Sequence, residues 1–511
     1  MDNLTRRQFV TTLSAGSLAT AENEKKYLSA ARTFLSTMIE KCTDRYGRRN
    51  TPLFCLSIDP ETYSPPKPPA RIDREYALTA EHLYRDFGYY WKSHLHGSNL
   101  IYDQGTIRAL YGLSEATKTS TYAKAADTCL DFFLNNLVSP QTGIFGWGEH
   151  LLYNVFLDYL AGGAFTVRAR RRFSYSHELD RWTTIYDVMW NKDPEKTRTE
   201  IEAIYEYKIH DPETFLNNRH SDFYSGQQIT DTLTFLKHSG LFAHAFAFLY
   251  SKTKEAKHLE WARKAADLFW NYRDPRTNLV RNCVQREDEP AAAGGMAELS
   301  LFLMRAYQWH PDARFLERAL AYIRAYHKWF TLDGNGRFRA TLSPDGSDRE
   351  PGQIAELWEG PIRQAKAAAL AYSLTGDSVA LELADNVIGA VTPEMTFSEG
   401  IERSRISAEV EARSCSLSAA LDLYEATANR KYLRSARALA DDAIQRFLYR
   451  GLFVSTMQIQ PESDRAASTR VYDGRSGAGW LALNLLRLQR DVDRTEEGRF
   501  KKFETLERIY D

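Results

Sequence analysis

A repeated helical hairpin constrains this chain more than any other feature of its sequence. Each copy has an apolar-faced helix, a short polar turn and a second helix that begins near an aromatic residue. Tyr250, Tyr307, Tyr372 and Tyr424, which precede such turns, follow one another at intervals of 57, 65 and 52 residues. That spacing accommodates one long hairpin and a loop, and it exceeds the period of tight helical solenoids.

The packing of these hairpins predicts the fold. Each hairpin has an apolar face that it cannot bury alone, so neighbouring hairpins must pack side by side, and closing the series into a ring removes its exposed ends. Segments with alternating β-branched residues are scarce, which argues against an extensive sheet. We therefore predict an all-α fold, an (α/α) toroid of six to seven helical hairpins. We expect residues 22–511 to form this single barrel domain, with loops at one mouth of the ring.

The charge balance narrows the range of partners. The 66 Lys and Arg residues nearly match the 67 Asp and Glu residues, for a net charge of −1. No overall field would therefore attract nucleic acid or a membrane surface, and a polyanionic substrate would need a local basic cleft. No stretch approaches the ~20 apolar residues of a membrane-spanning helix. The five cysteines are scattered without CxxC spacing, so neither a zinc knuckle nor a disulfide framework is indicated.

The N-terminus resembles an export signal. Arg6 and Arg7 precede a mild apolar stretch that ends at Ala21. Paired arginines in this position are typical of twin-arginine signals, which carry folded proteins out of the cytoplasm. We expect residues 1–21 to be such a signal and the protein to be periplasmic.

Residues 143–226 interrupt the hairpin pattern and concentrate side chains suited to chemistry. His150 follows a glycine-rich turn, Glu178 follows a histidine, and His220 follows an arginine. Two histidines and a carboxylate from separate elements are a sufficient protein set for Mn²⁺, Fe²⁺, Co²⁺ or Ni²⁺, with water or substrate in the remaining positions. The alternative is that each histidine is a hydrogen-bonded residue of a loop-rich cleft.

The same segment resembles a known family. The succession of the Gly146-Trp147-Gly148 turn before His150, the His177-Glu178 segment leading to Tyr186-Asp187, and the Arg219-His220 pair is similar to the periplasmic pectate lyases of polysaccharide lyase family 2. The resemblance implies an (α/α) barrel that cleaves polygalacturonate with a transition metal, usually manganese. It also implies His150, Glu178 and His220 as the metal ligands and Arg219 as the base.

The chemistry of β-elimination suits such a site. Removing the C5 proton of a uronate builds negative charge on the adjacent carboxylate, which a bound cation stabilises as a Lewis acid. Arginine is normally always protonated, so Arg219 is a base only if a neighbouring cation and desolvation favour its neutral form. Otherwise Tyr224, Lys237 or His177 would take the proton. The residues that we expect to contact an acidic polysaccharide are Trp147, His177, Arg181, Trp182, Tyr224, Lys237 and Arg475.

Other functions on the same scaffold stay open, since a fold does not determine an activity. A glycoside hydrolase such as a glucuronidase would need two carboxylates about 5–10 Å apart across the scissile bond. The candidates for that pair are Glu149, Asp180, Asp222, Glu356 and Glu359. A sugar epimerase would use histidine bases without an essential metal, and a non-catalytic glycan-binding protein would keep the toroid and its aromatic residues.

Overall fold

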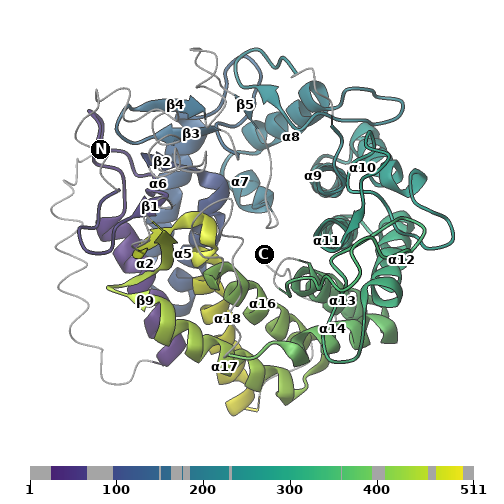
Figure 1. Cartoon of the computed structure of the whole chain (residues 1–511). Coiled ribbons are helices and arrows are strands. Elements are labelled where there is room, and N and C mark those ends of the chain that lie inside the picture. The colour runs from purple at the N-terminus through teal and green to yellow at the C-terminus, as the bar shows by residue number, and fades with distance from the viewer. Residues whose placement is uncertain are drawn as a thin grey trace.

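The computed structural model describes residues 25–65, 96–148, 151–162, 175–176, 184–228, 233–357, 360–393, 409–458 and 468–498. Within these segments, fourteen helices form a double-walled ring (Figure 1). The inner wall consists of α5 (Leu100–Thr117), α7 (Tyr186–Lys192), α9 (Leu236–Thr253), α11 (Ala293–Trp309), α13 (Pro361–Thr375), α16 (Glu409–Thr427) and α18 (Ala478–Glu496). The outer wall consists of α6 (Ser120–Asn136), α8 (Pro194–Lys208), α10 (Ala256–Asn271), α12 (Ala313–Phe330), α14 (Ser378–Ala390), α17 (Arg430–Phe447) and α2 (Lys26–Lys41).

Six of the inner helices pair with the outer helix that follows them in the chain. The seventh pair joins the two ends of the described chain, because α18 packs against α2. The described residues therefore contain seven helix pairs, which confirms the predicted all-α (α/α) toroid of six to seven hairpins.

The position of each helix follows from its sequence. The outer helix α17 buries one face, formed by residues three or four positions apart, as expected for a helix with solvent on its other side. The inner helix α16 is buried continuously from Val410 to Ala426 and is rich in alanine and serine. An inner helix contacts helices on several sides, so small residues let its neighbours approach closely.

The two mouths of the ring differ. Inner helices connect to their outer partners by short turns, some of which use a left-handed residue such as Lys118, Lys254 or Gly376, with φ of 55°, 59° and 71°. The connections back to the inner wall are long and span residues 42–99, 137–185, 209–235, 272–292, 331–360, 391–408 and 448–477. Because the inner helices run in the same direction, these long connections gather at one mouth.

Short strands occur mainly in the long connections, where the sequence pattern did not predict them. They are β1 (Ser57–Ile58), β2 (Gly97–Ser98), β3 (Leu151–Asn154), β4 (Tyr159–Gly162), β5 (Tyr175–Ser176), β6 (Ser221–Asp222), β7 (Ala291–Ala292), β8 (Thr341–Leu342), β9 (Leu448–Tyr449), β10 (Leu452–Phe453), β11 (Ser455–Gln458) and β12 (Ser468–Asp473). Their antiparallel pairings order the sheets as β1-β12-β11, β10-β9, β2-β3-β4, β5-β6 and β7-β8. Most have two residues, too few to produce a visible alternation of apolar and polar side chains.

The ring closes where α5 and α18 lie in backbone contact. A Cβ atom on Gly105 would lie 2.5 Å from the backbone nitrogen of Trp480, and one on Gly479 would lie 2.2 Å from the backbone nitrogen of Thr106. Beside this contact, Ser57 of β1 is paired with Asp473 of β12. Because these glycines carry no side chain, segments from the two ends of the described chain can thus pack backbone against backbone.

Buried ion pairs connect neighbouring inner helices. Arg108 of α5 binds Asp187 of α7, with 2.6 Å between Nη2 and Oδ1. Arg363 of α13 binds both Glu298 of α11 and Glu411 of α16, the latter at 3.1 Å. Removing one partner of such a pair leaves an uncompensated buried charge. Arrangements of the inner wall that separate the partners are therefore disfavoured.

His244 of α9 is a fully buried histidine in the same wall. Its Nε2 accepts a hydrogen bond from the indole N–H of Trp309 at 3.0 Å. Burial, together with the positive charge of Arg305, lowers the pKa of His244 to about 3. The imidazole of His244 is therefore neutral at physiological pH.

Among the described residues, no helix is both long and apolar enough to cross a membrane. The predicted export signal, residues 1–21, lies outside the described residues and stays a prediction.

Gly105→Ala should destabilise the protein by about 1–3 kcal/mol, because the added methyl group would overlap the backbone of α18. Gly112→Ala is the matched control on the same helix, since its Cβ would lie 3.4 Å from Leu486 Cδ1. The control should be neutral or stabilising by up to about 1 kcal/mol, as alanine favours a helix over glycine. Urea denaturation measures both, and equal stabilities of the two variants would contradict this account of ring closure.

His244 should make the free energy of unfolding depend on pH. The pKa is near 6.5 in an unfolded chain and about 3 in the fold, so the unfolded state binds the proton first as the pH falls. Above about pH 6.5, His244 is neutral in both states and does not lower the free energy of unfolding. As the pH falls from about 6.5 toward 3, the free energy of unfolding decreases by up to about 1.4 kcal/mol per pH unit. His244→Gln, which does not titrate, should lose less stability than the wild type between pH 7.5 and 5. If urea denaturation shows equal losses of stability in the wild type and in His244→Gln over this pH range, His244 does not cause the pH dependence.

Candidate functional site

In the sequence, all of the predicted site residues except Lys237 fall within the ranges of three of the long connections. Six of them fall in residues 137–185, between α6 and α7: Trp147, His150, His177, Glu178, Arg181 and Trp182. Arg219, His220 and Tyr224 fall in residues 209–235, between α8 and α9, and Lys237 lies in the first turn of α9. Arg475 lies in the short 3₁₀ helix η4 (Gly474–Ser476), directly before α18.

Five of these residues, His150, His177, Glu178, Arg181 and Trp182, lie outside the described residues. The predicted metal ligand set therefore stays a prediction, with His220 as its one described member. The structure does describe Leu151, which follows His150, and Ser176, which lies two residues before Glu178 in the chain.

The side chain of Asn99 holds the chain on both sides of residues 149–150. Its Nδ2 donates to the carbonyl oxygens of Gly148 and Leu151, at 2.6 and 3.2 Å, and its Oδ1 accepts from the Gly148 N–H at 3.3 Å. Asn99 is also the N-cap of α5, where its side chain accepts from the N–H of Ile101. Gly148 and Leu151 are thus both bound to the residue that begins an inner helix. An asparagine before an apolar helix is a capping signal in the sequence, but it does not reveal this second role.

Strands β5 and β6 bring two distant parts of the chain together. Their antiparallel register places Ser176 opposite Ser221 and Tyr175 opposite Asp222. Ser221 directly follows His220, and Ser176 is the last described residue before Glu178. The two connections are therefore paired within two residues, along the chain, of these two predicted ligands.

Buried polar side chains support the Arg219-His220 segment. Lys208, at the end of α8, has no exposed surface, and its ammonium donates to the carbonyl oxygen of Ser176 at 3.2 Å and to that of Arg219 at 3.4 Å. The Oδ1 of Asn218 accepts from the N–H of His220 at 2.9 Å. His220 is itself buried, with 8% of its surface exposed. The backbone of both residues is thus held from the protein interior.

The guanidinium group of Arg219 stacks on an aromatic ring beside a second arginine. Its Cζ lies 4.7 Å from the ring centre of Phe235, the N-cap residue of α9. The Cζ of Arg286 lies 5.9 Å from the same ring centre. The two guanidinium carbons are therefore no more than about 11 Å apart, the sum of these distances. Arg286 belongs to the following connection, residues 272–292, and no motif in the sequence pointed to it.

Trp147 and Tyr224 have opposite environments. Trp147 is 1% exposed and contacts the rings of Phe133 and Phe145, with centroids 5.8 and 5.2 Å away. In this structure its indole is part of the core. Tyr224 is 52% exposed and lies in a tight turn capped by Asp222, so its phenol is accessible from solvent.

The remaining predicted contacts are partly buried. Arg475 forms a bidentate ion pair with Asp473, with 2.9 Å from Nε to Oδ1 and 2.6 Å from Nη2 to Oδ2. Its guanidinium is therefore already paired with a carboxylate. Lys237 is half-buried at the start of α9.

The carboxylates proposed for glycoside hydrolysis are partly described. Glu149, Asp180 and Glu359 lie outside the described residues, and Glu356 is half-buried. Asp222 Oδ1 accepts from the N–H groups of Tyr224 and Ser225 and from the Ser225 hydroxyl, at 2.8–3.1 Å. These bonds give Asp222 a structural role in the turn.

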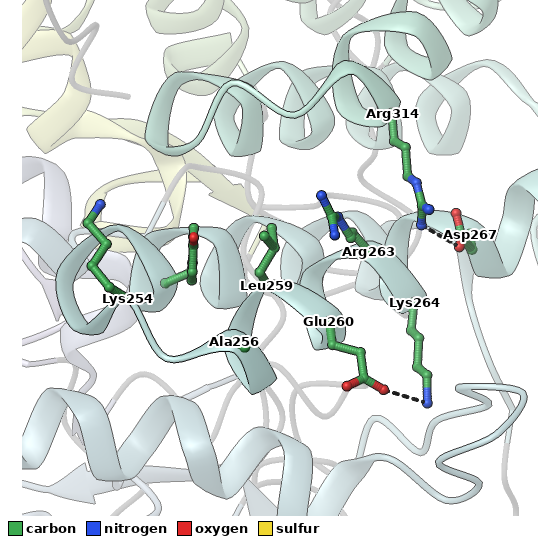
Figure 2. A pocket seen from close by; sticks show the side chains of 9 residues that line it. Lys254, Ala256, Leu259, Glu260, Arg263, Lys264, Asp267 and Arg314 are labelled. Atoms are coloured by element: carbon green, nitrogen blue, oxygen red, sulfur yellow. Dashed lines mark hydrogen bonds and ion pairs between the residues drawn. The ribbon is translucent and has the colours of Figure 1, made fainter.

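A groove on the outer wall, away from this mouth, is lined by charged side chains that are largely paired. It has a volume of about 570 Å³ and lies along α10 (Figure 2). Its charged side chains are largely paired: Arg314 with Asp267 at 3.3 Å, Lys264 with Glu260 at 3.1 Å, and Arg263 with Asp312 at 2.6 Å. These pairs leave little excess positive charge to attract a polyanion.

A cluster of Glu202, Glu255 and His258 on the outer helices has donor atoms within 4.8 Å of one another. Burial acts to raise the pKa of Glu202, but hydrogen bonds from Lys257, Arg198 and His258 outweigh it and lower the pKa to about 2. The carboxylates of this cluster are thus neutralised by basic side chains of the chain itself. We assign the cluster a structural role between α8 and α10.

Part of the chain is similar to known proteins. Residues 84–292 match the family of periplasmic pectate lyases, which confirms over that segment the resemblance seen in the sequence. A pectate disaccharide-lyase of Dickeya dadantii (strain 3937) is 27% identical over 220 residues, which cover 38% of this chain and 39% of that protein. The matched part of the relative is thus well under half of its length.

Solved structures with similar architecture include sugar-active enzymes. Cellobiose 2-epimerase from Bacillus thermoamylovorans B4167 is 11% identical, with a TM-score of 0.47, over 91% of this chain and 99% of that chain. A family 76 glycoside hydrolase from a bovine Bacteroides thetaiotaomicron strain is 13% identical, with a TM-score of 0.46, over 91% of this chain and 78% of that chain.

Proposed function

We propose that this protein is a metal-dependent pectate lyase, which cleaves polygalacturonate or a related uronan by β-elimination. The family match over residues 84–292 covers both connections that carry the predicted ligands and base. The structural observation that carries the proposal is the pairing of β5 with β6. It joins those two connections at Ser176, two residues before Glu178 in the chain, and at Ser221, directly after His220.

The proposed metal ligands are His150, Glu178 and His220. Two imidazoles and one carboxylate suit Mn²⁺, and also Co²⁺, Ni²⁺ or Fe²⁺. His220 fits this role because it is buried and its backbone N–H is bound by Asn218, which restricts its position. A divalent cation bound there would act as a Lewis acid on the C6 carboxylate of a uronate.

Arg219 is the proposed base. It would take the C5 proton, the electrons of the C5–H bond would form a double bond between C4 and C5, and the C4–O4 bond would break. The leaving oxygen then receives a proton, and the product carries a 4,5-unsaturated ring with no water consumed. Arg219 would have to be neutral to accept this proton, and its guanidinium shares the Phe235 ring with Arg286. Tyr224 and Lys237 are the alternative bases in the described part of this mouth.

Arginines at this mouth also favour an acidic substrate. Guanidinium groups bind carboxylates bidentately, and Arg286 is half-exposed with one long contact to Glu289, at 3.5 Å. On a protein with a net charge of −1, arginines such as Arg219 and Arg286 would provide the local attraction that the overall charge does not. The proposed location is the periplasm, in keeping with the family that residues 84–292 match.

The ultraviolet absorbance of the unsaturated product tests the proposed function in the wild-type protein. Polygalacturonate should yield this absorbance, a chelator should abolish it, and Mn²⁺ should restore it. Fully methyl-esterified substrate should react poorly, because it lacks the carboxylate charge. New reducing ends without the absorbance would instead identify a glycoside hydrolase.

Arg219→Ala should lower the rate of elimination by about 10²–10⁴-fold, the usual effect of losing a general base. Mn²⁺ binding should change little, because Arg219 is cationic and is not a proposed ligand. The matched control is Arg276→Ala, which removes an exposed arginine paired with Asp274 in the next connection and should retain wild-type activity. Near wild-type turnover by Arg219→Ala would assign the base to another residue, and Tyr224→Phe and Lys237→Met would be measured next.

A further inference from the structure

Lys208 occupies the joint between three elements of the proposed site. It is the last residue of α8, and its ammonium reaches Ser176 of β5 and the carbonyl oxygen of Arg219 just before β6. A further contact to the Ser176 hydroxyl measures 3.4 Å. One side chain thus contacts both of the chain segments that the β5–β6 pairing joins.

We propose that Lys208 is a positioning residue, which fixes Arg219 and His220 relative to the segment leading to Glu178. The proposal rests on the proposed function, because it assigns Lys208 the task of placing the predicted base and ligands. Lys208 would act through the backbone of these residues and would not touch substrate.

The complete burial of Lys208 supports this role. Taking an ammonium out of water is costly unless hydrogen bonds compensate for it, and a methionine of similar length would avoid that cost. Two acceptors come from Ser176 and one from Arg219. A cation at this point is also favoured by its position at the C-terminal end of α8. Burying the ammonium is therefore unfavourable in itself, but its hydrogen bonds hold the two strands in one register.

The backbone of Lys208 contributes to the same joint. Its carbonyl oxygen accepts from the N–H of Asn218 at 2.7 Å, and Asn218 in turn binds the N–H of His220. On the far side, Thr234 binds both the N–H and the carbonyl of Asn217 at 3.0 and 2.9 Å. The segment is thus anchored at both edges, and the ammonium of Lys208 connects it to β5.

Lys208→Met tests the proposal, with Lys192→Met as its matched control. Lys192 ends α7 and binds Asp127 and Asp131 on the outer wall, at 3.3 and 3.0 Å. Changes to residues that support metal ligands typically cost 10–100-fold in affinity or activity. Lys208→Met should therefore bind Mn²⁺ at least about tenfold more weakly, as measured by the electron paramagnetic resonance signal of free Mn²⁺. Its kcat on polygalacturonate should fall while KM changes less than about twofold, and Lys192→Met should resemble the wild type in both.

Amide hydrogen exchange gives a readout that needs neither metal nor activity. In Lys208→Met, protection should fall selectively at residues 218–222, while α12 keeps its protection. Lys208→Gln, which keeps an N–H donor, should fall between the wild type and Lys208→Met, and it serves if the methionine variant does not fold.

Wild-type Mn²⁺ affinity and kcat in Lys208→Met would overturn the proposal, as would a loss of protection spread evenly over the ring. A wild-type protein that neither binds Mn²⁺ nor cleaves polygalacturonate would instead refute the proposed function. In that case, amide hydrogen exchange at residues 218–222 alone decides whether Lys208 holds the two segments together.

Discussion

The backbone contact between α5 and α18 is the constraint on which the rest of the structure depends. Gly105 and Gly479 let the first and last inner helices approach without intervening side chains, and α2 covers the same seam from outside. A closed ring with alternating inner and outer helices must direct all its inner helices the same way. Every long connection then reaches the same mouth, whatever its sequence, and the candidate site is assembled there from segments far apart in the chain.

The site is held in place by a different kind of interaction from the ring. Apolar packing and a few buried ion pairs, such as Arg108 with Asp187, join the inner helices. At the mouth, the backbone is irregular, and polar side chains hold it instead: Asn99 binds the segment around His150, and Lys208 binds β5 and the carbonyl of Arg219. Because buried polar groups need specific partners, these bonds define the positions of the functional segments more narrowly than apolar contacts would.

Much of the fold could be predicted from the sequence, because hairpins with a regular interval and one apolar face leave few ways to bury that face. The segment carrying Arg219 and His220 was identified because it breaks the helical pattern and contains a recognisable motif. The short strands were not predicted, since two paired residues leave no periodic signal. Asn99, Lys208 and Arg286 were also missed, because their importance arises from contacts between distant segments. The ion pair of Arg475 with Asp473 and the burial of Trp147 likewise depend on three-dimensional neighbours that spacing does not disclose.

The central claim is that one metal ion joins two long connections at the mouth of the ring. Anomalous diffraction near the manganese absorption edge, from crystals of the protein loaded with Mn²⁺, tests it most directly. The account predicts one strong peak, about 2.0–2.4 Å from donor atoms of His150, Glu178 and His220. A peak at the outer cluster of Glu202, Glu255 and His258, or none near His220, would contradict it.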